Sequence, residues 1–191
     1  MNKIEHWPPA ASVNTESRVR TFFALVPHEA VRQQFLTLAR DVARRSRGRA
    51  MTGDHVHLTL AFLGDVDVAA LPVLRSIGDG LPLVGSVLDF DVLGAWRASG
   101  VAWIAPSAVP PSLAVLHETL RDRLADAGFV LEARAFRPHV TLARRCVQPH
   151  PRAHCAPVRW SVDRMSLIGS QLRPEGPLYT ELAAWTPRQP E

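Results

Sequence analysis

Apolar and polar positions alternate with two different periods along the chain, and the resulting elements occur twice in the same order. Residues 19–26 (VRTFFALV) form an apolar run typical of a buried strand. Apolar residues then recur at helical spacing between charged ones, at Val31, Phe35, Leu38 and Val42. Pro27 stands where this helix would begin, since proline is favoured in the first turn. Residues 57–64 follow as a second strand, so this part predicts strand, helix and strand.

The second half of the chain repeats that order at nearly the same spacing. Residues 101–105 (VAWIA) predict a short apolar strand. A helix follows with one apolar stripe, formed by Leu113, Leu116, Leu120 and Leu124. Pro111 is placed to open this helix and Gly128 to close it. From Pro27 to His57 is 30 residues, and from Pro111 to His139 is 28. We interpret the repeat as an internal duplication with a pseudo-two-fold axis.

The remaining segments predict a short helix and further strands. Residues 65–80 favour a short helix interrupted or begun at Pro72, and strands are expected at residues 84–96, 158–167 and 178–185. Residues 1–17 are polar and contain proline without a period, so we expect a flexible tail before a single domain at 18–191. A chain of 191 residues, 47% of them apolar, can bury a full core without disulfides or metals.

Two copies of one tetrapeptide pattern carry the candidate chemistry. They are His57-Leu58-Thr59-Leu60 and His139-Val140-Thr141-Leu142, and each opens an apolar strand. Because side chains alternate along a strand, the histidine and threonine of each copy share one face while the apolar residues fill the other. Two such copies suggest two imidazoles facing each other across one cleft. Two imidazoles can supply the general acid and the general base of a reaction near neutral pH.

These motifs and their flanks resemble the 2H phosphoesterase superfamily, and within it the bacterial and archaeal RNA 2′,3′-cyclic phosphodiesterases, long called 2′-5′ RNA ligases. The resemblance runs from about Val19 to Trp185. It rests on four segments, which are RTFFAL at 20–25, HLTLAFLG at 57–64, RPHVTLAR at 137–144 and Ser170 with GPLY at 176–179. It implies an α+β fold with two lobes, in which two antiparallel sheets with flanking helices border a central cleft.

The resemblance also implies a reaction and a role for each site residue. His57 would protonate the departing ribose 3′ oxygen, and His139 would take a proton from water, so that the product carries a 2′-phosphate. Thr59, Thr141 and Arg144 would hold the phosphate. The near-symmetry of the two motifs cannot assign the acid and the base by itself. No metal or other cofactor is expected.

Several residues near the motifs have open assignments. Strict alternation places Arg144 with Val140 and Leu142, opposite His139, so a phosphate contact requires a bulge or a strand end there. His55 shares a face with His57 by the same parity, and we expect it at the rim of the cleft. Three aromatic residues can either pack in the core or stack on a base, namely Phe22, Phe62 and Tyr179.

Three functions remain open from the sequence. The first is hydrolysis of RNA 2′,3′-cyclic phosphate ends. The second uses the same site for 2′-5′ RNA ligation or for hydrolysis of small cyclic nucleotides. The third is an RNA-binding module without catalysis, which two titratable groups argue against, since binding alone does not require them. The partner is accordingly an RNA or oligonucleotide end or a small cyclic nucleotide, and we expect a monomer.

Charge is concentrated in arginine. The chain has 22 basic residues, of which only Lys3 is lysine, and a formal net charge of +4. Arginine suits phosphate recognition, although a biased composition would give the same count. This charge permits an anionic substrate without establishing a nucleic-acid surface. The run at 44–49 (RRSRGR) is more typical of a solvated helix end than of an RNA contact.

The remaining features concern metals and location. Four residues have the types that bind zinc, namely Cys146, His150, His154 and Cys155, but they lie in one loop without a matching second pair of ligands, so we expect no metal there. Two cysteines make no disulfide framework. No apolar run reaches the roughly 20 residues of a membrane span. The N-terminus lacks the apolar core of a signal peptide. We therefore expect a cytoplasmic protein without membrane association.

Overall fold

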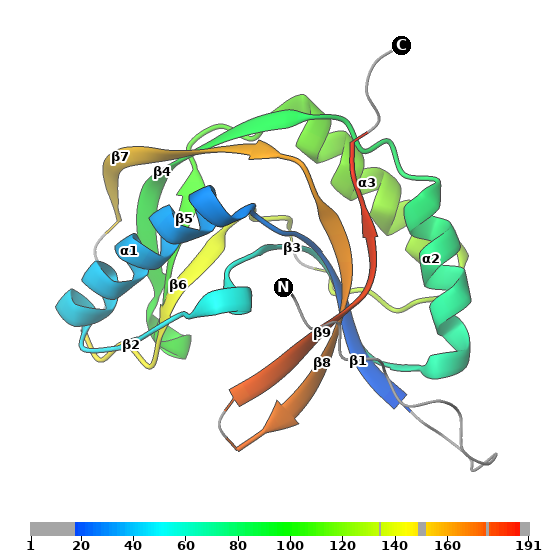
Figure 1. Cartoon of the computed structure of the whole chain (residues 1–191), viewed down its shortest axis with the longest axis horizontal. Helices are drawn as coiled ribbons and strands as arrows, with labels where there is room; N and C mark the ends of the chain where they lie inside the picture. Colours follow the sequence, from blue (N-terminus) through cyan, green and yellow to red (C-terminus); the bar gives the residue numbers. More distant parts are fainter. Residues whose placement is uncertain (1–17, 134, 149–151, 175, 188–191) are drawn as a thin grey trace.

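Figure 1 shows the computed structural model of the chain, which describes residues 18–133, 135–148, 152–174 and 176–187. Within these residues, nine strands join in the order β7-β4-β5-β6-β3-β1-β8-β9, with β2 added beside β6. The strands are β1 (Arg18–Leu25), β2 (Arg49–Ala50), β3 (Leu58–Asp67), β4 (Ser86–Trp96), β5 (Val101–Pro106), β6 (Val140–Arg144), β7 (Ala153–Val162), β8 (Met165–Arg173) and β9 (Gly176–Trp185). The helices are α1 (Glu29–Ser46), α2 (Leu71–Asp79) and α3 (Pro111–Asp126), with short turns of 3-10 helix at η1 (Gly53–His55), η2 (Val68–Ala70) and η3 (Arg97–Ser99).

The sheet divides into two lobes at the junction of β3 and β6. These two strands meet at one pair of residues, Leu58 and Val140. On one side lie β3, β1, β8 and β9, which we call the β1 lobe; on the other lie β6, β5, β4, β7 and β2, which we call the β5 lobe. All pairings are antiparallel. The α+β fold with two antiparallel halves is therefore confirmed.

The repeated order of elements is also present in the structure, but each helix packs on the lobe of the other copy. The first copy is β1-α1-β3 and the second is β5-α3-β6. Helix α1 packs on β6, β2 and β7, whereas α3 contacts β3 and lies beside α2. Phe35 of α1 meets the edges of Phe90 and Trp160, with ring centroids 5.3 and 6.0 Å apart. The two copies are thus interlocked through one core cluster.

The C-terminal strand closes the β1 lobe against α2. Trp185 stacks on Phe23 with ring centroids 5.9 Å apart, and its Nε1 donates to Oδ1 of Asp79 at 2.7 Å. A Cβ on Gly78 would lie within 2.2 Å of the Trp185 ring, so only glycine permits this approach. None of the described helices is long and apolar enough to cross a membrane.

Two element predictions were wrong in detail. Helix α1 begins at Glu29 with His28 as its N-cap, two residues after Pro27. The segment predicted as one strand at 158–167 is divided between β7, which ends at Val162, and β8, which begins at Met165. The chain turns there because β7 pairs with β4 in the β5 lobe, whereas β8 pairs with β1 in the other lobe.

Candidate active site

The two motif histidines lie at the junction of the lobes. His57 immediately precedes β3 and His139 immediately precedes β6, and these strands meet at Leu58 and Val140. Leu58 and Val140, which follow the two histidines, are fully buried. Because side chains alternate along a strand, each histidine lies on the opposite face of its strand. Both rings line one cavity of about 710 Å³. The sequence-based prediction that two imidazoles share one cleft therefore agrees with this geometry.

A β-bulge interrupts each motif strand at the same position. In β3, Ala61 and Thr59 pair with consecutive residues of β1, so that Leu60 is extra. In β6, Ala143 and Thr141 pair with consecutive residues of β5, so that Leu142 is extra. An extra residue reverses the alternation beyond it.

The reversal turns Phe62 and Arg144 back to the face that carries the histidines and threonines, and both residues line the cavity. The bulge that the phosphate contact of Arg144 required is thus present. Because the bulge occurs in both copies, Phe62 is the pseudo-symmetric counterpart of Arg144. The two halves of the cavity are therefore chemically different at this position.

His57 is held in a surrounding that disfavours its charged form. The pKa of His57 is lowered to about 4, chiefly by burial and to a lesser extent by the nearby charges of His139, His55 and Arg144, while the backbone of His55 partly opposes this. Its ring lies 5.0 Å from Phe22 and 5.7 Å from Tyr179, measured between centroids. Its Nδ1 is buried without a hydrogen-bond partner of good geometry in the described part of the chain. His57 is therefore neutral at pH 7 in the unliganded protein.

His139 has a defined tautomer. Its Nδ1 lies 2.7 Å from the carbonyl oxygen of Arg137, and because a carbonyl only accepts, Nδ1 carries the hydrogen. In the neutral ring the other nitrogen, Nε2, then carries the lone pair that accepts a proton. Trp96 packs edge-on against His139 with ring centroids 4.6 Å apart and also lines the cavity. This arrangement suits a general base.

Polar groups for an anion converge on the same cavity. Thr59 and Thr141 are half-buried and line it together with Arg144. The charge of Arg144 reaches both His57 and Tyr179, since it lowers the pKa of each group. For Tyr179, burial outweighs this effect and raises the pKa overall. All five residues proposed from the motifs are thus brought together.

The β1 lobe gives the cavity an aromatic side. Phe62 and Tyr179 pack against a small buried cluster that consists of Phe22, Ala24 and Ile168. The guanidinium carbon of Arg20 lies 4.7 Å from the centroid of the Phe62 ring, a cation–π contact. Phe22 is buried, so packing accounts for it, whereas Phe62 is half-buried and borders the cavity.

His55 lies at the rim of the cavity, although it belongs to η1 and not to a strand. Its Nδ1 lies 3.0 Å from the Thr52 carbonyl and its Nε2 lies 2.8 Å from the Pro177 carbonyl. These contacts connect η1 to the start of β9. The ring centroids of His55 and Tyr179 lie 4.8 Å apart.

The described residues of the segment from Cys146 to Cys155 show no metal cage, and the prediction of one loop there was wrong, because His154 and Cys155 lie in β7. His150 lies outside those residues. Cys146 and Cys155 are free thiols, and Nδ1 of His154 lies 4.0 Å from Oδ2 of Asp91. Nowhere in the described part of the chain do three or more metal-binding side chains gather.

Some residues of the site had weak signals or none in the sequence. The bulges have a signal, because Leu60-Ala61 and Leu142-Ala143 are consecutive apolar pairs that break strict alternation at the same place in both motifs. Trp96 has none, since it reaches His139 from the end of a different strand. The same applies to His117 and Phe136, which stack 3.8 Å apart and line a further part of the cavity.

Comparison with known proteins identifies relatives over most of the chain. The sequence model of one family, described as LigT like phosphoesterase, matches twice, at residues 26–103 and 104–179. The RNA 2′,3′-cyclic phosphodiesterase of Escherichia coli is 29% identical over 170 residues, which cover 87% of this chain and 95% of that protein. The protein of the same name from Thermotoga maritima is 28% identical over 176 residues, covering 86% and 93%.

Solved structures also align with most of this chain. Escherichia coli LigT in complex with 3′-AMP aligns with a TM-score of 0.82 and 28% identity, covering 91% of this chain and all of that one. A Thermus thermophilus protein aligns with a TM-score of 0.74 and 26% identity, covering 87% of this chain and 97% of that one. The first family match contains α1 and the motif strand β3, and the second contains α3 and the motif strand β6.

Proposed function

The chain belongs to the LigT-like phosphoesterase family, and from that membership we propose that it hydrolyses RNA 2′,3′-cyclic phosphate ends to 2′-phosphomonoesters. The observation that carries this proposal is the pair of motif histidines, which line one cavity together with both threonines and Arg144. Opening the cyclic diester requires a base for water, an acid for the leaving oxygen and donors for the charged phosphate oxygens. The cavity supplies one group or more for each task.

We assign the base to His139. The hydrogen bond from Nδ1 to the Arg137 carbonyl orients the ring and keeps the lone pair on Nε2. From that position Nε2 takes a proton from the attacking water. The hydrogen bond also stabilises the imidazolium that forms, because a carbonyl oxygen accepts from the charged ring as well.

We assign the acid to His57, which must carry a proton when the diester ring opens. Its pKa of about 4 leaves it neutral in the unliganded protein at pH 7. A bound phosphodiester brings a negative charge between the two rings, and an opposite charge nearby raises the pKa of an imidazole. His57 therefore takes up its proton with the substrate and passes it to the 3′ oxygen.

We assign the binding of the non-bridging phosphate oxygens to Thr59, Thr141 and Arg144. Hydroxyl donors and a guanidinium fork stabilise the charge that grows on the non-bridging oxygens in the transition state. Since side chains supply every group in this scheme, the proposed reaction uses neither a metal nor another cofactor. Exhaustive chelation is expected to leave turnover intact, whereas loss with EDTA and recovery with zinc or magnesium would contradict this part of the proposal.

The same scheme places the nucleoside. In an in-line displacement, the water and the leaving 3′ oxygen lie on opposite sides of phosphorus. The ribose keeps its 2′ oxygen on phosphorus and lies on the side of the leaving 3′ oxygen. With His57 as the acid, the ribose lies toward the β1 lobe and its base comes near Phe62, the aromatic ring that borders the cavity there. Base–aromatic stacking is the recognition mode this ring offers.

We further propose that residues 18–191 act as one domain, because both lobes line the same cavity and share one core cluster. The proposal takes the enzyme to be a cytoplasmic monomer without membrane association, as expected from the sequence. Gel filtration with light scattering checks the oligomeric state, and a stable dimer would overturn that element alone.

The decisive experiment incubates the protein with a panel of nucleoside and oligonucleotide 2′,3′-cyclic phosphates and identifies the product by phosphorus NMR. The expected product is the 2′-phosphomonoester from every member that is accepted. No hydrolysis of any member would refute the proposed function, and a 3′-phosphomonoester would reverse the roles of the two histidines.

A further inference from the structure

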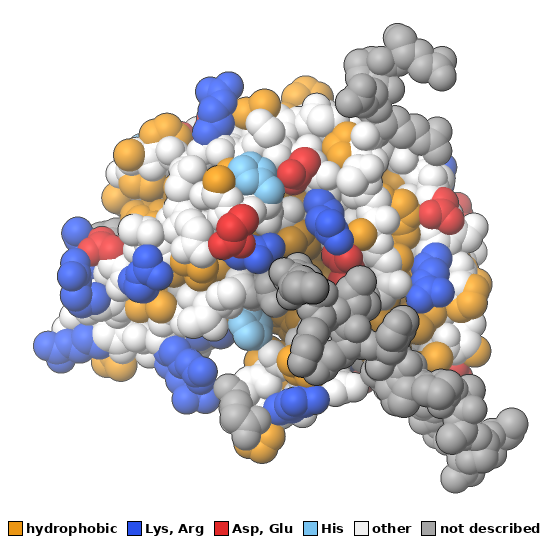
Figure 2. All heavy atoms as spheres, in the orientation of Figure 1, with side chains coloured by type: hydrophobic (Ala, Val, Ile, Leu, Met, Phe, Trp, Pro, Cys, Tyr) orange, Lys and Arg blue, Asp and Glu red, His pale blue; other side chains and the backbone are white. Residues whose placement is uncertain are grey.

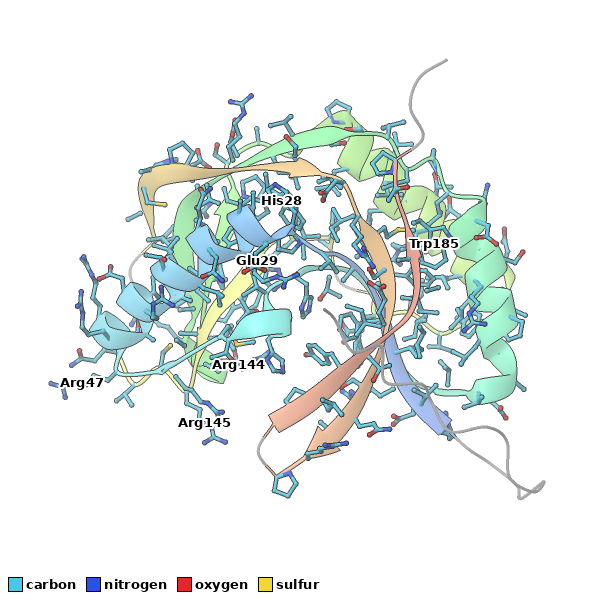
Figure 3. The ribbon with its side chains drawn as sticks, viewed as in Figure 1. His28, Glu29, Arg47, Arg144, Arg145 and Trp185 are labelled. Atoms are coloured by element: carbon cyan, nitrogen blue, oxygen red, sulfur yellow. The ribbon has the colours of Figure 1, made fainter. Side chains whose placement is uncertain are left out.

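Four arginines gather at one edge of the β5 lobe, next to the cavity. We call them the arginine edge: Arg47, Arg49, Arg144 and Arg145. All four are exposed. Figure 3 shows Arg144 nearest the middle of the molecule, with Arg145 and Arg47 farther out along the same side. Basic side chains gather on this side in the space-filling view as well (Figure 2).

The backbone fixes these arginines relative to one another, although two segments far apart in the sequence supply them. Strand β2 pairs with β6 so that Arg49 lies opposite Arg144. The amide groups of Val147 and Gln148 both donate to the Ser46 carbonyl at 3.0 Å. A Cβ on Gly48 would lie 2.7 Å from Sγ of Cys146 and 3.0 Å from the Arg144 carbonyl oxygen, so the two segments cross at contact distance.

This arrangement is unfavourable for an isolated protein. Like charges directly opposite each other on paired strands repel, as Arg49 and Arg144 do. Arg47 and Arg145 also adopt left-handed backbone conformations, with φ of 49° and 56°, which are unfavourable for residues other than glycine. The neighbouring Arg44 and Arg45 differ, because each forms a salt bridge with Asp41. Within the described residues, no acidic side chain pairs with the four members of the arginine edge.

We propose that the arginine edge binds the backbone phosphates of an RNA chain whose 2′,3′-cyclic end occupies the cavity. The inference rests on the proposed function and narrows its substrate class to oligonucleotides. Arg144 lines the cavity and also belongs to the arginine edge. It therefore lies between the reacting phosphate and the site proposed for the backbone phosphates of the preceding nucleotides. Guanidinium groups without acidic partners suit a row of phosphates because each is a planar, bidentate donor. Backbone phosphates carry the same charge in every sequence, so this contact is independent of base identity.

The test compares a triple variant, Arg47→Gln, Arg49→Gln and Arg145→Gln, with the wild-type protein on two substrates. One is adenosine 2′,3′-cyclic phosphate and the other is a ten-nucleotide RNA with the same terminal nucleotide and cyclic end. A matched control carries Arg40→Gln, Arg123→Gln and Arg159→Gln, three exposed arginines on α1, α3 and β7 that change the net charge equally. Turnover of the mononucleotide reports whether each variant retains a folded site.

The wild-type protein is expected to have a higher kcat/KM on the RNA than on the mononucleotide, with a steeper fall as salt rises. In the triple variant, the ratio of kcat/KM on the RNA to kcat/KM on the mononucleotide is expected to be at least tenfold lower than in the wild-type protein. The salt slope of the triple variant on RNA should be shallower by about 2, since each phosphate contact to a single strand contributes about 0.7. The control variant should keep the wild-type ratio.

Two outcomes overturn the inference while leaving the proposed function standing. One is a wild-type protein that hydrolyses both substrates with equal kcat/KM and equal salt dependence. The other is a triple variant that loses the same factor on both, which would assign the arginine edge to the stability of the site. If neither substrate is hydrolysed, fluorescence anisotropy with the labelled RNA still decides, because the triple variant must then bind it at least tenfold more weakly than the control variant.

Discussion

Leu58 lies directly opposite Val140 at the only registered pair between the two motif strands in the described structure. Continuing that antiparallel register by one residue in each direction places His57 opposite Thr141 and His139 opposite Thr59. Each imidazole is therefore a cross-strand neighbour of the hydroxyl from the other motif. The two motifs form one site because the lobes meet here, and neither lobe carries a complete site alone.

This mutual dependence predicts strongly non-additive effects for the two histidines. His57→Ala and His139→Ala should each lower kcat by roughly 10²–10⁴-fold, the usual contribution of a general acid or base. The double variant should be little worse than either single variant, because both groups act in one step. His28→Ala serves as the control, since His28 is exposed at the N-cap of α1. Near-normal turnover in either single variant would refute the two-histidine mechanism.

Arg144 should act on both the phosphate and His57. Arg144→Gln is expected to lower kcat/KM on mononucleotide cyclic phosphates by about 10²-fold, the scale on which a lost transition-state donor acts. It should also raise the pKa of His57, because Arg144 lowers it in the native protein. Arg144→Lys should recover part of the rate and keep the His57 pKa low. NMR titration of the His57 ring measures the second effect, which a purely structural role for Arg144 would not produce.

Phe62 should matter only for substrates that carry a base. Phe62→Leu is expected to raise KM for adenosine 2′,3′-cyclic phosphate by about tenfold, in line with the loss of one base–aromatic stack. Glycerol 1,2-cyclic phosphate has the reacting ring without a base, and its kcat/KM should change much less. Phe62→Tyr keeps the aromatic face and should restore KM. Equal losses on both substrates would show that Phe62 serves packing alone.

The sequence was sufficient to predict the duplicated strand, helix and motif strand, because each element has its own hydrophobic period. It could not show that α1 covers the lobe of the second copy, since period alone does not say which sheet a helix packs on. For the site, His57 and His139 followed from the repeated motif. Arg144 needed a bulge, whose signal is one extra apolar residue after each threonine. Trp96 reaches the site only through tertiary structure.

Burial of His57 should weaken the protein in acid. The pKa of His57 is about 4 in the folded state and near the ordinary 6.5 in the unfolded state. Between these values the unfolded chain binds more protons, so the free energy of unfolding falls as pH is lowered from about 6.5 to 4. The full contribution is up to about 3 kcal/mol. Burial lowers the pKa of His117 as well, so it acts in the same direction.

Urea unfolding between pH 4 and 8 separates the two histidines. His57→Gln should flatten the acid side of the stability curve relative to the wild-type protein, leaving the slope due to His117. A curve of unchanged steepness in this variant would mean that His57 is not a buried neutral group in the folded protein.

The pH dependence of the rate tests the roles of the histidines most directly. Since kcat/KM reports the free enzyme, its acid limb should lie below the ordinary histidine value, because burial of His57 disfavours a second proton on the pair. The bound phosphate favours imidazolium, so the acid limb of kcat should lie at higher pH than that of kcat/KM. These limbs belong to the coupled pair, because His57 and His139 repel each other when charged.

Product analysis across the same pH range then tests the acid–base mechanism separately from the assignment of the acid to His57 and the base to His139. A bell-shaped profile with only 2′-phosphomonoester agrees with His57 as the acid and His139 as the base. A bell-shaped profile with 3′-phosphomonoester keeps the chemistry and exchanges the roles, which would also move the ribose away from Phe62 and toward Trp96. A flat profile between about pH 5 and 9 would contradict histidine acid–base catalysis altogether.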